Sequence, residues 1–350
     1  MTLDDPEAKR VGRSGDARLP VRGAPIARIV RELGPPGRRA QVLLLAHERP
    51  DGDAVGSCLA LGSILRARGH RARVVLADEV PRRYGFLRGV DRIAAPEEVR
   101  PRAPYVAFAI DATDPHRLGA AGGLFEAASR RIVIDHHASN SFFGDVNWVD
   151  GRASAVGEMI YGMASSLSWR IPPDAHEALY VAVLTDTGRF SFGNTTAGSL
   201  RVAAELVEAG VDPEKVAQRI YSSRSLAEWE LEARARSSLR LELGGRVATM
   251  ELSAEDFRRT GTTPAAANDL ASLTRTIEGV ELGLFFYEID GGARTKVGIR
   301  TSHAVDANRL AARLGGGGHP QAAGCVIEGR LEFSRRRMLE EAERFLRRRR

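Results

Sequence analysis

Cysteine is scarce in this chain, which has only Cys58 and Cys325 among its 350 residues. Two cysteines exclude a disulfide framework and suit a reducing compartment, so we expect a cytoplasmic protein. Long hydrophobic runs are lacking as well. The longest are about six residues, against the roughly 20 that span a membrane, which excludes an integral membrane protein. The first residues include Asp4, Asp5 and Glu7 and no apolar core, so we expect no secretory signal.

Aromatic residues are also few, at 6%, whereas 43% of the residues are hydrophobic and 27% are charged. This composition is typical of a globular protein and excludes a disordered chain or a collagen-like fibre. At roughly 150 residues per domain, the length predicts two domains.

Positive charge is in excess, but it is concentrated at the two ends of the chain. The formal net charge is +6, and residues 1–40 and 331–350 each carry +4, so the remaining residues carry −2. Basic ends of this kind fit either a solubilising fringe or a surface that binds a polyanion, and we favour the fringe.

Residues 25–212 show the pattern of a doubly wound, mostly parallel α/β domain, and the polar, non-periodic residues 1–24 before them are interpreted as a mobile leader. Short continuous apolar runs are typical of strands buried on both faces of a parallel sheet. We expect strands at residues 41–46, 73–77, 105–110 and 131–134, and helices at residues 54–68, 174–185 and 196–209.

The rest of the chain predicts a helical linker (residues 213–242) and a smaller α/β domain with a mixed sheet (residues 243–350). The linker is expected to hold one polar, charged helix over residues 214–240. The second domain is expected to contain strands at residues 246–252, 281–289 and 293–300, a helix at 264–277, a glycine-rich loop at 315–318 and a helix at 333–350.

Acidic and histidine side chains gather where the predicted strands of the first domain end. The carboxyl ends of parallel strands meet at one edge of the sheet, where open α/β sheets bind their ligands. The clusters are His47, Asp51 and Asp53 after the first strand, Asp111 after the third, Asp135, His136 and His137 after the fourth, and Asp186 at a helix end.

So many carboxylates at one edge would repel one another unless cations compensated them. Carboxylate and imidazole ligands without thiolates suit Mn²⁺, with Mg²⁺, Co²⁺ or Zn²⁺ as alternatives. About six ligands are too many for one tetrahedral ion, so we infer two divalent cations roughly 3.5–4 Å apart. Each motif alone is explained as well by a turn, a helix end or a chance histidine pair, but their common edge favours a metal site.

These motifs resemble the four signature motifs of the DHH phosphoesterase family. The resemblance rests on HERPDGDAVGS from His47 to Ser57, Asp111 with Arg117, Asp135-His136-His137, and Asp186-x-Gly188-x-Phe190. In the second domain, Gly316-Gly317-Gly318-His319 followed by Ala-Ala-Gly resembles the DHH-associated domain, so the likeness covers about residues 25–330. Within the family, the two-domain layout is similar to the bacterial oligoribonucleases (nano-RNases) that also dephosphorylate pAp, a 3′,5′-bisphosphate nucleotide.

The resemblance implies a role for each of these residues. His47 and Asp51 would hold one ion, Asp53, His136 and Asp186 would hold the other, and Asp111 would bridge the two. Asp135 would fix an imidazole tautomer, and His137 would face the substrate phosphate as a hydrogen-bond donor or an acid. The implied substrate-binding residues are Arg117, Arg300, Ser302, Gly316, Gly317, Gly318 and His319. The family's Ser-x-Arg-Ser pattern keeps its arginine here but begins with Gly298.

The resemblance implies a two-metal phosphodiesterase that hydrolyses short oligoribonucleotides and linear dinucleotides to mononucleotides and removes the 3′-phosphate of pAp. A second domain that holds a terminal phosphate would favour short substrates. A RecJ-like single-strand exonuclease is the alternative, although the charge of −2 on the body of the chain disfavours the basic groove it needs. A non-catalytic nucleotide sensor is another alternative, disfavoured because no metal ligand is missing.

Four phenylalanines lie close to the motifs in sequence and are candidates for stacking on nucleotide bases. They are Phe142, Phe143, Phe190 and Phe192. For each of them we favour core packing over base stacking, so none is assigned to the site. We expect no membrane partner, and a homodimer is compatible with the sequence.

Overall fold

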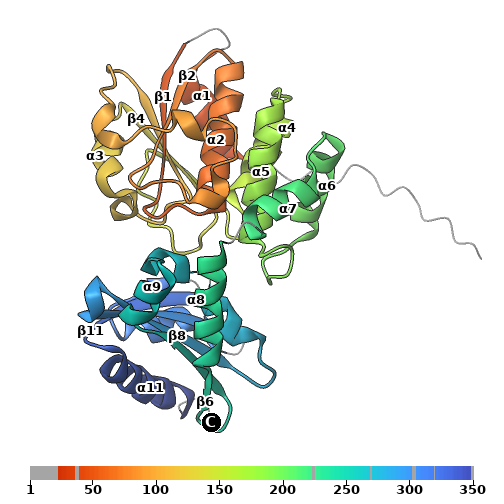
Figure 1. Cartoon of the computed structure of the whole chain (residues 1–350). Coiled ribbons are helices and arrows are strands. Elements are labelled where there is room, and N and C mark those ends of the chain that lie inside the picture. Colours follow the sequence, from red (N-terminus) through yellow and green to blue (C-terminus); the bar gives the residue numbers. More distant parts are fainter. Residues whose placement is uncertain are drawn as a thin grey trace, which may run out of the picture. The chain divides into compact units, whose positions relative to one another are not determined.

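The computed structural model describes residues 23–35, 39–222, 225–268, 270–301, 305–318 and 320–347. The chain divides into two compact units, Met1–Ser223 and Arg224–Arg350, each with its own sheet and hydrophobic core (Figure 1). Of the residues singled out above, Ser302 and His319 lie outside the described part of the chain, as do residues 1–22 of the expected leader.

A five-stranded parallel sheet forms the centre of the first unit, in the order β2-β1-β3-β4-β5. Its strands are β1 (Gln41–Ala46), β2 (Arg71–Val75), β3 (Val106–Ile110), β4 (Arg130–Asp135) and β5 (Val146–Val149). The chain moves outward from β1 to β2 and then returns to the other side of β1 to form β3. In doubly wound folds, ligands bind outside the carboxyl ends of the strands at such a reversal. The predicted doubly wound fold is therefore confirmed.

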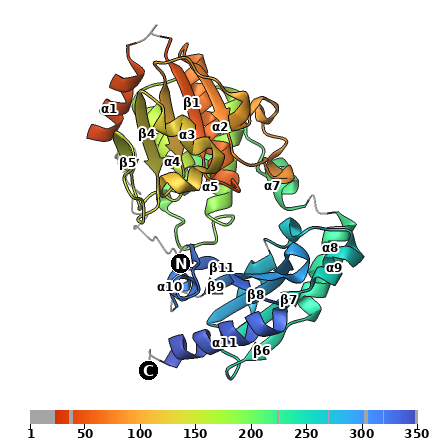
Figure 2. The ribbon, with the colours of Figure 1, turned by 90° about the vertical axis from the view of Figure 1, so that its left-hand side faces the viewer.

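Both faces of this sheet are buried, which explains why its strands are continuous apolar runs. In β1, Leu44 packs into the core cluster on one face, whereas Leu43 and Leu45 pack into the cluster on the other. The larger cluster draws on α1 (Ala24–Leu33), α2 (Gly52–Ala67), α4 (Val156–Ser166), α5 (Pro173–Asp186), α6 (Ala197–Glu208) and α7 (Pro213–Tyr221) (Figure 2). The smaller cluster draws on α3 (Gly122–Glu126) and the 3₁₀ helix η4 (Pro115–Ala121).

Helices α2 and α5 meet closely where α2 begins. A Cβ on Gly52 would lie 2.3 Å from the hydroxyl oxygen of Thr185, so only glycine allows this approach. Helix α2 starts there because the Asp51 side chain accepts hydrogen bonds from the first amides of the helix. The approach brings the amino end of α2 next to the carboxyl end of α5, where Asp186 is the last residue.

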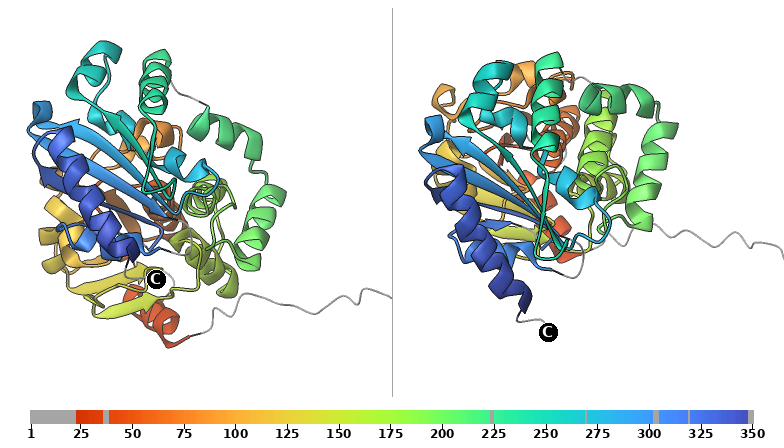
Figure 3. Two further views of the ribbon diagram at one scale, coloured as in Figure 1. Left: turned by 90° about the horizontal axis from the view of Figure 1, so that it is seen from below. Right: turned by 60° about the horizontal axis from the view of Figure 1, so that its bottom comes forward.

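The second unit is built on a six-stranded mixed sheet in the order β10-β11-β9-β8-β7-β6, in which only β7 and β8 pair in parallel. Helices α8 and α9 pack in one core cluster and α10 and α11 in the other, on opposite faces (Figure 3). The elements are α8 (Leu226–Ser237), β6 (Arg240–Glu242), β7 (Val247–Leu252), α9 (Ala254–Thr260), β8 (Leu282–Ile289), β9 (Arg294–Thr301), α10 (Ala307–Ala312), β10 (Gly317–Gly318), β11 (Ala322–Glu328) and α11 (Leu331–Arg347).

The structure differs from the expectation in several elements. The single helix expected at residues 214–240 is two helices, α7 and α8, because Ser225 and Glu228 form a capping box that starts a new helix at Leu226. The helix expected at 264–277 consists of two short 3₁₀ helices, Pro264–Ala267 and Leu270–Thr276. Strands β5 and β11 and helix α4 were not anticipated. None of the described helices is both long and apolar enough to cross a membrane.

Candidate metal centre

Side chains from four separate segments meet at the carboxyl edge of the first sheet. The first segment runs from His47, directly after β1, into the start of α2; Asp111 follows β3, His136 follows β4, and Asp186 ends α5. Three overlapping groups have ligand atoms within 4.8 Å of one another: His47 with Asp51 and Asp111, Asp53 with His136 and Asp186, and Asp111 with His136 and His137. The side chains that the sequence singled out as metal ligands are thus brought together.

Asp111 lies at the centre of this cluster and has an unsatisfied carboxylate. It is 4% exposed, and its Oδ1 atom has no hydrogen-bond partner. Oδ2 lies 3.5 Å from Nε2 of His47, and Oδ1 lies 3.6 Å from Nε2 of His136. Asp111 also has a φ of 55°, in the left-handed region that few non-glycine residues adopt. A buried, unsatisfied carboxylate on strained backbone is unfavourable by itself and is expected where a ligand compensates it.

The ring of His47 is oriented by the backbone. Its Nδ1–H donates to the carbonyl oxygen of Glu48 at 2.7 Å, since a carbonyl can only accept. Nε2 is therefore directed at Asp111, and at Asp51, whose Oδ1 is 3.9 Å away. Burial opposes the charged form of His47, but the two carboxylates outweigh burial and raise its pKa to about 11.

His136 is held in the same way by a different carbonyl. Its Nδ1–H donates to the oxygen of Ala153 at 3.2 Å, which leaves Nε2 free to bind. Nε2 lies 3.5 Å from Oδ2 of Asp186 and 4.0 Å from Oδ2 of Asp53. Burial lowers the affinity of the ring for a proton, but Asp186, Asp111 and Asp53 together raise the pKa of His136 to about 9.

Asp53 is fixed by hydrogen bonds from its own helix, α2, and from the start of α4. Its carboxylate accepts from the hydroxyl of Ser57 at 2.7 Å and from the first amides of α4, Val156 at 2.6 Å and Gly157 at 3.0 Å. Burial and the negative charge of Asp111 nevertheless raise the pKa of Asp53 to about 7. The site therefore holds more negative charge than its two imidazoles compensate.

A hydrogen-bonded chain lies behind the cluster and ends at His137. Asp135 is fully buried, and its Oδ1 accepts from Nδ1 of His137 at 2.7 Å. The amide of Asn140 donates to the other oxygen of Asp135 at 2.6 Å and to the carbonyl of Ala112 at 2.9 Å. Burial opposes the charge on His137, but its bond to Asp135 and the charge of Asp111 raise its pKa. No sequence signal marked Asn140, because a single asparagine in a loop is usually a turn residue.

Asn194 is a second residue that sequence reasoning missed. Its amide donates to the backbone oxygen of Asp186 at 3.1 Å, to the Oδ2 atom of that residue at 3.3 Å and to the carbonyl of Ser154 at 3.1 Å. It thereby orients the Asp186 carboxylate at the end of α5. Burial, together with the charges of Asp53 and Asp51, raises the pKa of Asp186 despite the opposing effect of His136.

The aromatic residues near the motifs differ in exposure. Phe143 packs in the core, with its ring 5.3 Å from that of Phe125. Phe142 is 60% exposed, so core packing was the wrong expectation for it. Its φ is 56°, and its amide donates to Oδ1 of Asn140 at 2.7 Å. The asparagine that holds Asp135 thus also fixes the backbone that presents the Phe142 ring to solvent. Phe192 is 40% exposed.

Arg117 is half-buried on η4, and its carbonyl accepts from the amide of Glu48 at 2.7 Å. The backbone of Arg117 is therefore tied to the segment that follows β1. The resemblance to the DHH family implied that the side chain of Arg117 binds the substrate.

In the second unit, the glycine run has a packing reason. Gly317 and Gly318 pair with β11, and a Cβ on Gly316 would lie 2.2 Å from the oxygen of Gly324. The amide of Gly318 already donates to Asn308 at 3.0 Å. Arg300 lies on β9, the neighbour of β11, and donates from Nη1 to the carbonyl of Ile299 at 3.0 Å.

The donor set of the first unit fits two divalent cations. Each of two groups of three ligands supplies carboxylate oxygens and an imidazole Nε2 that no backbone group occupies. Asp111 belongs to the first group and faces His136 of the second through its other oxygen. Positive ions would satisfy the bare Oδ1 of Asp111 and offset the excess negative charge. Among the described residues, no cysteine takes part in these groups.

Known proteins resemble this chain over nearly its full length. The DHH family N-terminal domain matches residues 41–183, and the DHHA1 domain matches residues 244–348. A protein of Thermus thermophilus named bifunctional oligoribonuclease and PAP phosphatase NrnA is 33% identical over 301 residues, which cover 85% of this chain and 88% of that protein. Its namesake in Bacillus subtilis is 29% identical over 289 residues, 82% of this chain and 89% of that protein.

A solved structure shows the same fold. The crystal structure of an exopolyphosphatase-related protein from Bacteroides fragilis matches with a TM-score of 0.85 at 21% identity, over 93% of this chain and 96% of that one. The domain matches and the identity to the Thermus protein agree with the motifs and with the ligand geometry. The chain therefore belongs to the DHH family of phosphoesterases and is a hydrolase that acts on phosphoester bonds.

Proposed function

We propose that this protein is a two-metal phosphodiesterase that hydrolyses short oligoribonucleotides and linear dinucleotides to mononucleotides and also removes the 3′-phosphate of pAp. The observation that carries the proposal is the pair of three-ligand groups that meet at the buried carboxylate of Asp111, whose Oδ1 has no hydrogen-bond partner. The substrate class is supported by the relatives in Thermus thermophilus and Bacillus subtilis, which are named as oligoribonuclease and PAP phosphatase.

In this proposal, one cation is held by His47 and Asp51 and the other by Asp53, His136 and Asp186, with Asp111 between them. The carboxylate and imidazole donors favour Mn²⁺, with Mg²⁺ or Co²⁺ as alternatives. Bound cations would supply an activated water at neutral pH and compensate charge on the phosphoryl oxygens.

The residues around the ligands prepare the site for this chemistry. The carbonyls of Glu48 and Ala153 fix the His47 and His136 rings with Nε2 directed into the cluster. Asp135 keeps a proton on Nδ1 of His137 and favours the charged ring. A charged His137 would donate a hydrogen bond to a phosphoryl oxygen or a proton to the leaving oxygen, and no covalent nucleophile is required.

Substrate contacts are assigned by chemistry. The guanidinium of Arg117 offers paired donors for a phosphate, and the exposed ring of Phe142 offers a face on which a base can stack. In the second unit we assign phosphate contacts to Arg300 and to the backbone of Gly317, whose position tolerates close approach of an anion. The same role is proposed for Gly316, Gly318, Ser302 and His319.

The test is metal-supplemented hydrolysis of 5′-labelled RNAs of two to about 24 nucleotides, with pAp and linear di-adenylate and di-guanylate alongside. We expect Mn²⁺-dependent release of mononucleotides, with the fastest rates on the shortest RNAs, and phosphate release from pAp. Equal rates on the shortest and longest RNAs would favour a RecJ-like exonuclease. Saturable nucleotide binding without turnover in any metal would favour the sensing alternative.

A further inference from the structure

A second concentration of charge lies on the first unit, away from the metal centre. A pocket of about 780 Å³ is lined by Gln41 and Arg71, which are the first residues of β1 and β2. In a parallel sheet the amino ends of the strands lie at the edge opposite their carboxyl ends, where the metal ligands are. The pocket is therefore separate from the site described above.

The pocket has strongly positive walls. Its lining includes one histidine, His70, and six arginines: Arg66, Arg71, Arg73, Arg92, Arg100 and Arg102. Residues 41–102, which span the lining, contain eight Asp and Glu residues, and none of them lines the pocket. Among the described residues, the one ion pair of these arginines joins Arg92 to Asp91, at 3.9 Å on the exposed surface. The positive charge therefore has little compensation.

Two residues of the lining differ in how their polar groups are satisfied. Burial lowers the pKa of Arg66, while the charge of Asp174 outweighs the repulsion from Arg92, and the exposed guanidinium of Arg66 donates to the carbonyl of Ala72 at 3.2 Å. His70 is 6% exposed, and its Nδ1 has no hydrogen-bond partner. Burial and the charge of Arg68 lower the pKa of His70, so its ring stays neutral. A bound anion would relieve the repulsion among the guanidinium groups.

Protection of a sheet edge explains part of this pattern. Strand β2 is an edge strand, and charged side chains on edges discourage pairing with other chains. That accounts for Arg71 and Arg73 but not for Arg66 on α2, nor for Arg100 and Arg102, which lie beyond β2 in the chain and converge on the same pocket.

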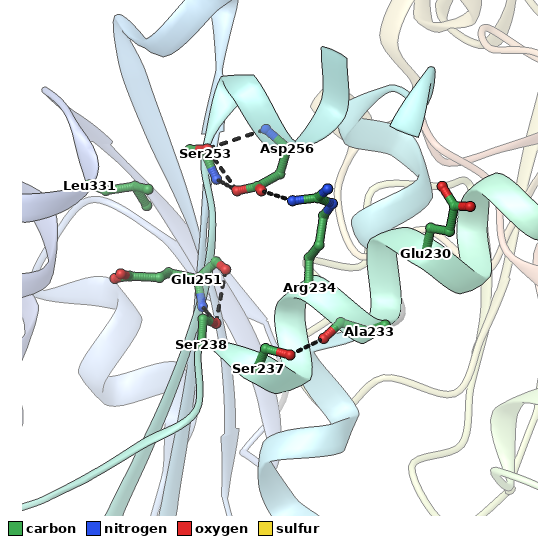
Figure 4. A pocket seen from close by; sticks show the side chains of 9 residues that line it. All are labelled: Glu230, Ala233, Arg234, Ser237, Ser238, Glu251, Ser253, Asp256 and Leu331. Atoms are coloured by element: carbon green, nitrogen blue, oxygen red, sulfur yellow. Dashed lines mark hydrogen bonds and ion pairs between the residues drawn. The ribbon is translucent and has the colours of Figure 1, made fainter. Parts of the chain in front are cut away.

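A pocket in the second unit provides a contrast. It measures about 680 Å³, and the one arginine in its lining is paired with an aspartate (Figure 4). Nη1 of Arg234 lies 3.3 Å from Oδ1 of Asp256, and the other oxygen of Asp256 accepts a hydrogen bond from Ser253, the residue that caps α9. The hydroxyl of Ser238 donates to the carbonyl of Glu251 and accepts from its amide. The positive charge in the second-unit pocket is therefore compensated, unlike most of the positive charge in the arginine pocket.

We propose that the arginine pocket binds a nucleoside polyphosphate. Guanidinium groups bind phosphate oxygens through paired donors, and several arginines on separate segments suit two or more linked phosphates. The apolar residues of the lining, Leu43, Leu59 and Val99, are each at most 3% exposed, so a base would stack mainly on the guanidinium planes of the arginines. The volume lies within the range of small-molecule sites. The proposal does not depend on the phosphodiesterase activity.

The test measures binding of ATP to the full-length protein by titration calorimetry in excess EDTA, where the metal centre is empty and no hydrolysis occurs. Arg71→Gln combined with Arg73→Gln should weaken binding by about tenfold or more, because two charge-assisted contacts are lost. Arg170→Gln combined with Arg201→Gln is the matched control, since both arginines are exposed and outside the lining. Dinucleotide hydrolysis in Mn²⁺ should stay the same in both double variants.

Further ligands separate the contribution of the phosphates to binding from that of the base. Adenosine alone should bind weakly, and tripolyphosphate should bind less tightly than ATP. Equal affinities for tripolyphosphate and ATP would refute the base contact. ATP binding that is absent, or that survives in the Arg71/Arg73 variant, would overturn the site. A different result would be binding of an RNA of about 12 nucleotides without any binding of ATP. If the Arg71/Arg73 variant also lost that RNA binding, the pocket would be a binding surface for single-stranded nucleic acid and not a nucleotide site.

Discussion

Nδ1 of His137 and Oδ1 of Asp135 are 2.7 Å apart, so the imidazole and the carboxylate act as one unit. The carboxylate is completed by the amide of Asn140 and by the backbone amide of His136. Such a fully hydrogen-bonded carboxylate orients an imidazole and favours its charged form.

Asp135→Asn should lower kcat by about 10–100-fold while leaving metal content unchanged, because Asp135 is absent from the ligand groups. Loss of the carboxylate removes a cause of the raised pKa of His137, so that pKa falls. If charged His137 serves catalysis, the alkaline limb of the pH–rate profile moves to lower pH. Asp114→Asn is a matched control, because Asp114 caps η4. If the alkaline limb of the pH–rate profile did not move in Asp135→Asn, the role of His137 would be contradicted.

Asp111→Asn should abolish turnover but not folding. Asparagine tolerates the left-handed backbone at this position. Without metal, the substitution relieves an oxygen that has no hydrogen-bond partner but also removes the charge that faces His47 and His136, so the free energy of unfolding in EDTA should change by no more than about 1–3 kcal/mol. Thermal unfolding in EDTA and hydrolysis in Mn²⁺ measure the two effects. Activity within tenfold of the wild type would refute a central role for this carboxylate.

Metal affinity should rise with pH. In the metal-free protein, His47 and His136 have pKa values of about 11 and 9, and Asp53 has a pKa of about 7. These groups therefore hold protons at neutral pH that a cation must displace, and raising the pH removes this competition. Mn²⁺ titration at about pH 6 and about pH 8, in buffers of different ionisation enthalpy, should show tighter binding at high pH and net proton release. A pH-independent affinity would contradict the prediction.

Adjacent phenylalanines should respond differently to truncation. Phe142→Ala should raise KM for a dinucleotide by about 5–100-fold, as loss of one stacked base predicts, with little change in Tm because the ring is exposed. Phe143→Ala should instead reduce the free energy of unfolding by about 1–3 kcal/mol, since its half-buried ring packs against Phe125. An unchanged KM in Phe142→Ala would exclude the stacking role.

The glycine run can be tested residue by residue. Gly316→Ala should destabilise the second unit by about 1–3 kcal/mol, because its Cβ would collide with the oxygen of Gly324. Gly317→Ala should fold normally, since its Cβ would lie 3.6 Å from the nearest atom, Oδ1 of Asn308. If the Gly317 backbone contacts a phosphate, this variant loses activity while keeping its Tm. Full activity would limit the run to a packing role.

Much of the fold could be predicted because parallel strands covered on both faces leave an unmistakable apolar pattern, as in residues 42–46 of β1. The ligand side chains were predictable for a related reason: each follows a strand or ends a helix. Asn140 and Asn194 were not predictable, because their roles depend on loop paths that place one amide between several acceptors. Strand β5 is only half-buried beyond its first residue and leaves a weak signal.

Asp53 has a consequence for how ions are acquired. Its carboxylate is anchored by a hydroxyl and two peptide amides that do not depend on any cation. A cation that binds at this side chain would therefore find its ligand oxygen already in position. Capture of an ion would then need no ordering of Asp53, and its loss would leave this part of the framework intact.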